Sequence, residues 1–207
     1  CINIHVSLLP RWRGAAPVPA AILAGESEMG VCVIDVAEKM DSGEILEMRR
    51  ASIPETWNAG QALEELASRG AVALLDVLDS AARGSLQRVR QDETKTTHAP
   101  KVISEDGRIR WEESAEQVSR RVRAMTPRPG AYSFLPDGMR LKVIQGQAIS
   151  TERRGLPGEV LEMEGLVVAC DEGAFEILEA QRSGGKAMMA DALLRGHPIL
   201  PGTRMGP

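Results

Sequence analysis

The first six residues of the chain alternate between apolar and polar side chains, with Asn3 and His5 as the polar members. This period of two is typical of a β-strand with one buried face, and it places the Asn3 and His5 side chains on the same side. Residues 7–14 contain Pro10, two arginines and Gly14, and cannot continue the strand. We expect them to form a loop.

The pattern then predicts a short helix over residues 17–24, with Pro17 in its first turn and Gly25 after its end. Two β-rich apolar runs follow, residues 31–36 and 44–50, and the turn between them favours a hairpin. From residue 58 to 82, apolar residues recur every three or four positions, as on an amphipathic helix. The predicted buried stripe of that helix is Leu63, Leu66, Val72, Leu75, Leu78 and Ala82.

Residues 84–107 are polar and lack a sustained period, which is typical of a linker. Beyond them, Ser114 and Gln117 have the spacing of a capping box, and a helix is predicted from there to residue 125. Short apolar runs at residues 131–135, 139–144, 158–163, 166–170 and 174–180, separated by turn signals, indicate a small barrel or sandwich. A helix over residues 186–195 is expected near the end of the chain.

Composition is that of a soluble globular protein, with 43% hydrophobic and 26% charged residues. The net charge of −4 and pI of about 5.5 do not indicate a nucleic-acid binder. Three cysteines at irregular spacing suit neither a disulfide framework nor a zinc site, and no apolar run is long enough for a membrane span or a leader. Because the chain begins without Met inside an apolar stretch, we expect it to be truncated.

Asn3 and His5 together could serve acyl transfer, because an amide can stabilise an oxyanion and an imidazole exchanges protons near neutral pH. Asp41 could orient that imidazole if folding brings the two together. The alternative is structural: Asn3 and His5 would be polar residues on a half-exposed strand, and Asp41 a turn former that binds local amides.

Residues 3–17, NIHVSLLPRWRGAAP, resemble the hallmark of folate-dependent formyltransferases, and residues 10–17 resemble the methionyl-tRNA branch in particular. The MDSG stretch at residues 40–43 is similar to the second hallmark of this family. Residues 99–111 resemble its interdomain linker, and the GKAM stretch at 185–188 with LPGTR at 200–204 resembles its carboxyl-terminal part. The resemblance extends along essentially the whole chain.

The resemblance implies an α/β fold: the second half of a Rossmann-like formyltransferase domain over residues 1–86, a linker over 87–110 and an OB-like β-barrel that binds tRNA over 111–207. It implies formyl transfer from 10-formyltetrahydrofolate to the amino group of initiator methionyl-tRNA, without a metal. Asn3 would donate to the formyl oxygen, His5 would handle protons and Asp41 would polarise His5. Folate would contact Ser7, Leu8, Leu9, Pro10, Val36, Lys39 and Met40.

RNA-binding candidates are Arg11, Arg13, Arg120, Arg121, Arg123 and Arg128, although a solvated helix face explains the last four equally well. Likewise, Trp12 could pack on the domain and leave its flanking arginines in solvent. We expect a monomeric, cytoplasmic protein, or an organellar one in a eukaryote, with no membrane partner.

Two other classes remain open. An enzyme that formylates an amino sugar nucleotide shares the folate chemistry, whereas the single-domain purine enzyme would lack residues 113–207. A noncatalytic RNA-binding relative would have lost the active site, against which the presence of Asn3, His5 and Asp41 speaks. Because the first half of the expected catalytic domain is absent, we expect the 207 residues alone to be inactive.

Overall fold

A computed structural model describes residues 1–206 of the chain. Its contacts divide the chain into two units, Cys1–Val102 and Ile103–Pro207. The boundary falls inside the predicted linker of residues 87–110, so the two parts of that segment belong to different units. In the first unit the elements are β1 (Ile2–His5), β2 (Arg13–Gly14), α1 (Pro17–Leu23), β3 (Glu28–Asp35), β4 (Ile45–Ser52), α2 (Ala59–Ala82), the 3-10 helix η1 (Glu93–Lys95) and β5 (His98–Ala99).

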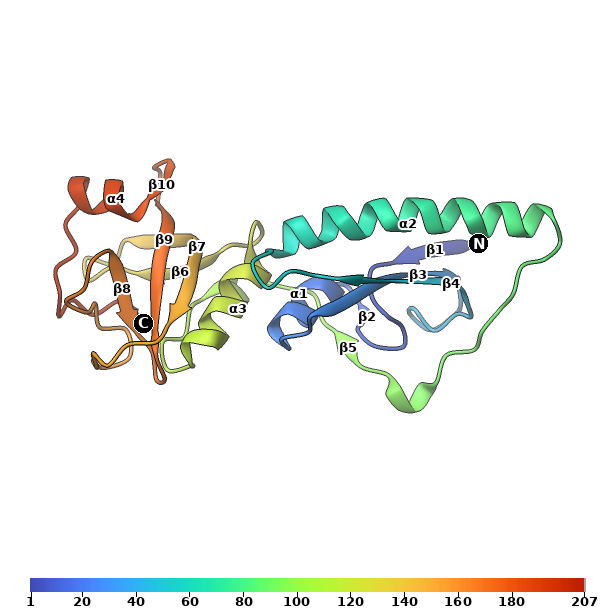
Figure 1. The fold of residues 1–207 in the computed structure, drawn as a ribbon, viewed down its shortest axis with the longest axis horizontal. Helices are drawn as coiled ribbons and strands as arrows, with labels where there is room; N and C mark the ends of the chain where they lie inside the picture. The colour runs from blue at the N-terminus through green and yellow to red at the C-terminus, as the bar shows by residue number, and fades with distance from the viewer. Residues whose placement is uncertain (207) are drawn as a thin grey trace. The chain divides into compact units, whose positions relative to one another are not determined.

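The three-stranded sheet of the first unit has the order β1-β3-β4 and its pairings are antiparallel (Figure 1). The predicted hairpin is confirmed, but β3 begins at Glu28 because the ladder continues to a Glu28–Ser52 pair. Both faces of β3 are covered, which explains its unbroken apolar run. Val33 packs against α2, while Cys32 and Ile34 pack against Leu9 of the 7–14 loop.

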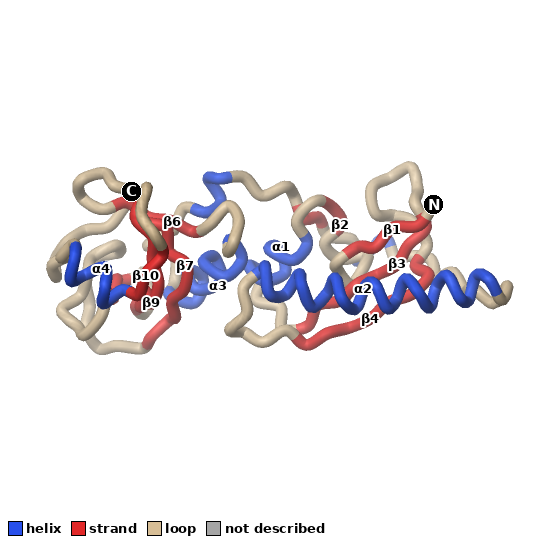
Figure 2. Tube along the Cα trace, turned by 90° about the horizontal axis from the view of Figure 1, so that it is seen from above, coloured by secondary structure: helices blue, strands red, loops and turns tan. Residues whose placement is uncertain are grey.

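Helix α2 runs along the sheet, as Figures 1 and 2 show from two directions. Asn58 caps it: the Asn58 side chain accepts from the Gln61 amide, and the Gln61 side chain accepts from the Asn58 amide. The residues on its buried face are mostly small: Ala59, Ala62, Leu66, Gly70, Ala73 and Val77. A Cβ at Gly70 would lie 2.9 Å from Cγ2 of Ile4, so this glycine permits the close approach of the helix to the sheet.

The predicted buried stripe of α2 is therefore wrong, except for Leu66, which is fully buried. Its other large members are exposed: Leu63 by 46%, Val72 by 48%, Leu75 by 65% and Leu78 by 51%. Ala82 is exposed as well. The error has a physical cause: close helix–sheet packing selects small side chains, which a search for large apolar residues overlooks.

The second unit contains the 3-10 helix η2 (Ser104–Gly107), α3 (Ala115–Met125), β6 (Ala131–Phe134), β7 (Arg140–Ile149), β8 (Leu166–Ala169), β9 (Ala174–Arg182), β10 (Ala187–Met189) and α4 (Ala190–Gly196). Its sheet has the order β10-β9-β7-β6, and β8 also pairs with β9. All of these pairings are antiparallel. Among residues 1–206, no hydrogen-bonded ladder joins β6 to β8 or β10, so the strands form a curled sheet.

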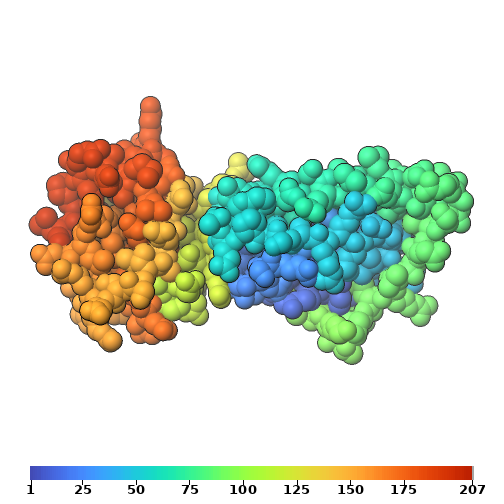
Figure 3. All heavy atoms as spheres, viewed as in Figure 1, coloured from blue at the N-terminus to red at the C-terminus, as the bar shows by residue number. Residues whose placement is uncertain are grey.

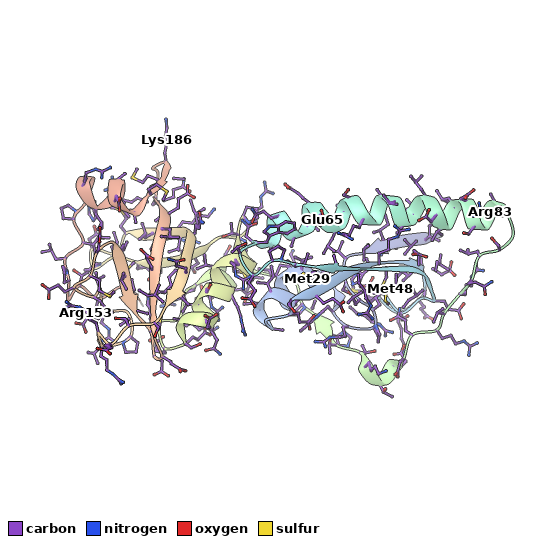
Figure 4. The ribbon with its side chains drawn as sticks, in the orientation of Figure 1. Met29, Met48, Glu65, Arg83, Arg153 and Lys186 are labelled. Carbon is purple, nitrogen blue, oxygen red and sulfur yellow. The ribbon has the colours of Figure 1, made fainter. Side chains whose placement is uncertain are left out.

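Several sequence predictions for the second unit are confirmed, including the Ser114–Gln117 capping box at the start of α3. Two are wrong. Residues 158–163 make isolated bridges such as Val160–Val168 and no strand. The expected helix over residues 186–195 begins only at Ala190, because residues 187–189 pair with β9. Figure 4 shows Lys186 pointing away from the turn that precedes β10.

No helix within residues 1–206 combines the length and the apolar character needed to cross a bilayer.

Candidate active site

His5 lies at the end of β1 and contacts both loops that approach this strand. Its side chain is 6% exposed. Nε2 is 3.0 Å from the carbonyl oxygen of Trp12, and Nδ1 is 3.5 Å from Oδ2 of Asp41. The structure therefore brings His5 and Asp41 together, although they are 36 positions apart in the sequence.

The partners of His5 determine which ring nitrogen carries a hydrogen. A carbonyl oxygen only accepts, so the contact with Trp12 requires a hydrogen on Nε2. Nδ1 is then the nitrogen that faces the Asp41 carboxylate. A carboxylate in that position can orient the imidazole ring.

Asp41 lies in the loop between β3 and β4 and has a φ of 54°, in the left-handed region that Asp tolerates better than most residues. Its Oδ2 accepts a hydrogen bond of 2.8 Å from the amide of Gly14. Gly43 closes the loop, and no larger residue fits there because a Cβ would lie 1.7 Å from the Asp35 carbonyl oxygen. The carboxylate is thus bound by one loop and carried by another.

Asn3 lies on β1, two residues before His5, and pairs with Ile34 of β3. Strand geometry directs both side chains to one face of the sheet. Asn3 is exposed, whereas His5 is buried. An exposed carboxamide next to a buried imidazole leaves Asn3 accessible to a bound molecule.

Arg13 is 5% exposed and belongs to the interior of this site. Its guanidinium donates to Gln91 (Nε 3.1 Å, Nη2 2.7 Å) and to both carboxylate oxygens of Glu93 (3.1 and 2.8 Å). These bonds hold the pKa of the Glu93 carboxyl below its usual value, chiefly through the hydrogen bond from Arg13. The expectation that Arg13 contacts RNA is replaced by an internal role, because its donors are already engaged.

The other candidate RNA-binding arginines are in different environments. Arg11 is half exposed, pairs with Glu26 and lies with Cζ 5.6 Å from the centre of the Trp12 ring. Arg121 is 12% exposed and donates to Glu113 and to the Asp106 carbonyl oxygen, so it also has an internal role. Three remain on or near the surface of the second unit: Arg120 and Arg123, which are partly exposed, and Arg128, which is exposed.

The predicted folate-contacting residues divide into two groups. Ser7, Leu8, Leu9 and Pro10 line a cavity of about 840 Å³, together with residues of β3, β4 and the 92–97 segment. Met29 and Met48 belong to its wall (Figure 4). Neither His5 nor Asp41 lines this cavity.

The second group consists of Val36, Lys39 and Met40, on the loop that carries Asp41. Val36 is 58% exposed and Met40 is 71% exposed. Lys39 is also exposed. The two groups therefore do not share one cavity. Side-chain contact from Leu9 is further limited, because its side chain is buried against Cys32 and Ile34.

Sequence reasoning missed the role of the 89–99 segment, which it assigned to the linker. Strand β5 pairs in parallel with β2, and the Thr97 hydroxyl accepts from the Trp12 amide at 2.9 Å. In the space-filling view of Figure 3, the light-green atoms of this segment lie against the blue amino-terminal region. A polar segment without periodicity carries no local signal for such contacts. Among residues 1–206, no group of three or more His, Cys, Asp or Glu side chains is placed to hold a metal ion.

Comparison with known proteins identifies two matching family models. The formyl transferase model matches residues 1–78, and the model of the formyl transferase C-terminal domain matches residues 101–198. The chain is similar to the methionyl-tRNA formyltransferase of Acidiphilium cryptum (43% identity; 100% of this chain, 66% of the relative). It is also similar to that of Neisseria meningitidis serogroup C / serotype 2a (39% identity; 99% of this chain, 67% of the relative). The chain thus spans about two thirds of the length of these curated relatives.

Solved structures share the fold at lower identity. HypX from Aquifex aeolicus, in complex with tetrahydrofolic acid, aligns with a TM-score of 0.72 at 24% identity, over 93% of this chain and 34% of HypX. WlaRD, a sugar 3N-formyl transferase solved with dTDP and 5-N-formyl-THF, aligns with a TM-score of 0.69 at 18% identity, over 87% of this chain and 64% of WlaRD. Identity to the curated relatives is about twice as high, and with the two family models it shows that the chain belongs to the methionyl-tRNA formyltransferase family.

Proposed function

We propose that this chain forms part of an enzyme that transfers a formyl group from 10-formyltetrahydrofolate to the α-amino group of initiator methionyl-tRNA. The observation that carries the proposal is the buried His5–Asp41 pair, with Nδ1 and Oδ2 3.5 Å apart. The family membership supports the folate donor, and HypX, which shares the fold, was solved in complex with tetrahydrofolic acid.

The reaction has three steps that the protein can assist. The neutral amine attacks the formyl carbon, the carbonyl becomes an oxyanion, and the bond from that carbon to folate N10 then breaks. Asn3 donates a hydrogen bond to the oxyanion. His5 handles the proton that passes from the amine toward N10 of the folate, and Asp41 orients the His5 ring.

The acceptor follows from the relatives with the higher identity, which are named methionyl-tRNA formyltransferases. For the second unit we propose an OB-like barrel that binds RNA, with Arg120, Arg123 and Arg128 contributing phosphate contacts. Arg11 is the candidate from the first unit, since its guanidinium is half exposed beside Trp12. As part of translation initiation, the enzyme would act in the cytoplasm.

The test is an assay of the full gene product with 10-formyltetrahydrofolate and initiator tRNA charged with methionine. Formylmethionine, released from the tRNA and identified by mass spectrometry, is the expected product. The substitution His5→Asn should lower kcat by about 10²- to 10⁴-fold, the usual contribution of a general acid–base. His197→Asn, a histidine of the second unit far along the chain from this site, is the matched control.

A second candidate acceptor is an amino sugar, because WlaRD, a sugar 3N-formyl transferase, shares the fold. The same assay decides between them when a dTDP-linked amino sugar replaces the charged tRNA. Formylation of the sugar without formylation of methionyl-tRNA would overturn our choice of acceptor. Full activity of a folded His5→Asn variant would overturn the assignment of the active site.

A further inference from the structure

The polar segment between α2 and β5 is attached to the active site at both ends. Near its start, Val89 exchanges two backbone hydrogen bonds with Ile45, of 2.8 and 2.9 Å. Near its end, the Thr97 carbonyl oxygen accepts from the Arg13 amide and the Ala99 carbonyl oxygen accepts from the Ala15 amide, both at 2.9 Å. The backbone around residue 91 is therefore held between the Asp41 loop and the 7–14 loop.

Gln91 uses its whole side-chain amide to join these two loops. Its Nε2 donates to the carbonyl oxygens of Asp41 and Gly43, each at 2.7 Å. Its Oε1 accepts from Nε and Nη2 of Arg13, at 3.1 and 2.7 Å. Both hydrogens and both lone pairs of the amide are thus in use.

The chemistry of the partners permits only one orientation of this amide. If the oxygen and nitrogen were exchanged, the NH₂ group would face guanidinium donors and the oxygen would face two carbonyl oxygens. Neither contact could be a hydrogen bond. A side chain with fewer donors or acceptors at position 91 would leave polar groups of the site without this partner.

We propose that Gln91 is a positioning residue, which holds the Asp41 carboxylate at its place beside His5. This inference rests on the function proposed above. The two bonds from Nε2 restrain the backbone on both sides of Ser42, and hence the residue that carries the carboxylate. The bonds from Arg13 restrain the neighbouring residue Gly14, whose amide donates to Oδ2 of Asp41 at 2.8 Å. One side chain thus aligns the carboxylate and the amide that binds it.

Two variants separate this role from general support of the fold. Gln91→Met has a similar shape without donors or acceptors, and Gln91→Glu keeps acceptors for Arg13 but loses both donors to the Asp41 loop. Gln87→Met and Gln87→Glu are matched controls, since Gln87 is an exposed residue of the same segment. Within residues 1–206 its side chain donates one long hydrogen bond, to the Ser85 carbonyl oxygen at 3.4 Å. None of the four substitutions replaces His5 or Asp41.

In the formylation assay, both Gln91 variants are expected to lower kcat by about 10- to 100-fold. The KM values for folate and methionyl-tRNA should change by less than about threefold, because alignment acts on the chemical step more than on binding. Loss of stability alone would lower the urea midpoint and leave kcat per folded molecule unchanged. Wild-type kcat in folded Gln91→Glu would reduce the role of Gln91 to holding Arg13 and would overturn the inference.

A second measurement does not depend on catalysis. Hydrogen exchange of the Gly14 amide, followed by NMR, reports the bond to Asp41 directly. We expect exchange at Gly14 to be at least about tenfold faster in Gln91→Met and unchanged in Gln87→Met. Unchanged exchange at Gly14 in Gln91→Met would overturn the positioning role, even if the enzyme proved to act on another formyl acceptor. Absence of formylation by the wild-type protein, with Gly14 exchange as expected, would instead overturn only the proposed function.

Discussion

At the scale of residues, the site depends on contacts that give each buried donor and each charged group a partner. His5 is held between a carbonyl oxygen and a carboxylate, and Asp41 is held by the Gly14 amide. The sequence motifs identified His5 and Asp41 as candidates, but motif spacing does not specify a distance between them. The contact itself depends on the pairing of β1 with β3 and on the turn that follows β3.

The cysteines provide a prediction at the same scale. Burial raises the pKa of the Cys32 thiol to about 11 and that of Cys170 to about 12, whereas Cys1 is exposed. Because the thiolate is the reactive form, Cys32 and Cys170 should resist iodoacetamide at pH 8 while Cys1 is alkylated. Peptide mass spectrometry of the labelled protein would measure each site.

Unfolding in urea should make all three cysteines reactive, since exposed thiols return to a pKa of about 8.5. Raising the pH of the folded protein from 7 to 9 should leave Cys1 the fastest site in absolute rate, because Cys32 and Cys170 are still almost entirely protonated at pH 9. Rapid alkylation of Cys32 in folded protein would contradict the packing of Leu9 over β3.

At the scale of elements, α2 illustrates how packing overrides periodicity. Both the extent of the helix and its Asn58 cap follow from local sequence, and the predicted extent is confirmed. Its buried face does not follow from the largest apolar residues, because Gly70, Ala62 and Ala73 allow the helix to approach the sheet closely. The choice of face depends on which side chains fit against Ile4 and Val31.

The orientation of α2 is tested by a pair of leucine substitutions in the 207-residue chain. Leu66 is fully buried, so Leu66→Ala should lower the free energy of unfolding by about 2–5 kcal/mol. Leu63 is 46% exposed, and Leu63→Ala should change it by about 0.5 kcal/mol or less. Urea denaturation followed by circular dichroism would measure both, and a larger loss for Leu63→Ala would mean that the helix faces the sheet differently.

At the scale of the molecule, the chain forms two units, and buried hydrophobic clusters lie within each of them. Residues 103–207 contain a single tryptophan, Trp111, which is 3% exposed and donates to the Ser133 hydroxyl at 3.0 Å. A buried tryptophan of this kind reports the integrity of the core around it. The second unit therefore has an internal probe of its own folding.

We expect residues 103–207, expressed alone, to fold and to unfold cooperatively in urea. Trp111 fluorescence should shift to longer wavelength in a single transition, and circular dichroism should follow the same curve. Ser133→Ala should lower stability by about 1 kcal/mol through loss of the hydrogen bond to Trp111. A red-shifted spectrum without urea would show that this unit needs the rest of the chain.

Local features could be predicted from the order of amino acids alone: the β3–β4 hairpin, the helices α2 and α3, and the motif residues His5 and Asp41. The hairpin and the two helices follow from propensity, capping and turn chemistry, which act over a few residues. His5 and Asp41 are singled out by the resemblance of residues 3–17 and 40–43 to the motifs of a known family. Three-dimensional packing was needed to establish which face of α2 is buried, that Arg13 is an internal anchor and that Gln91 joins two loops. Such contacts connect residues far apart in the chain, and their energy depends on specific neighbours that a local pattern does not encode.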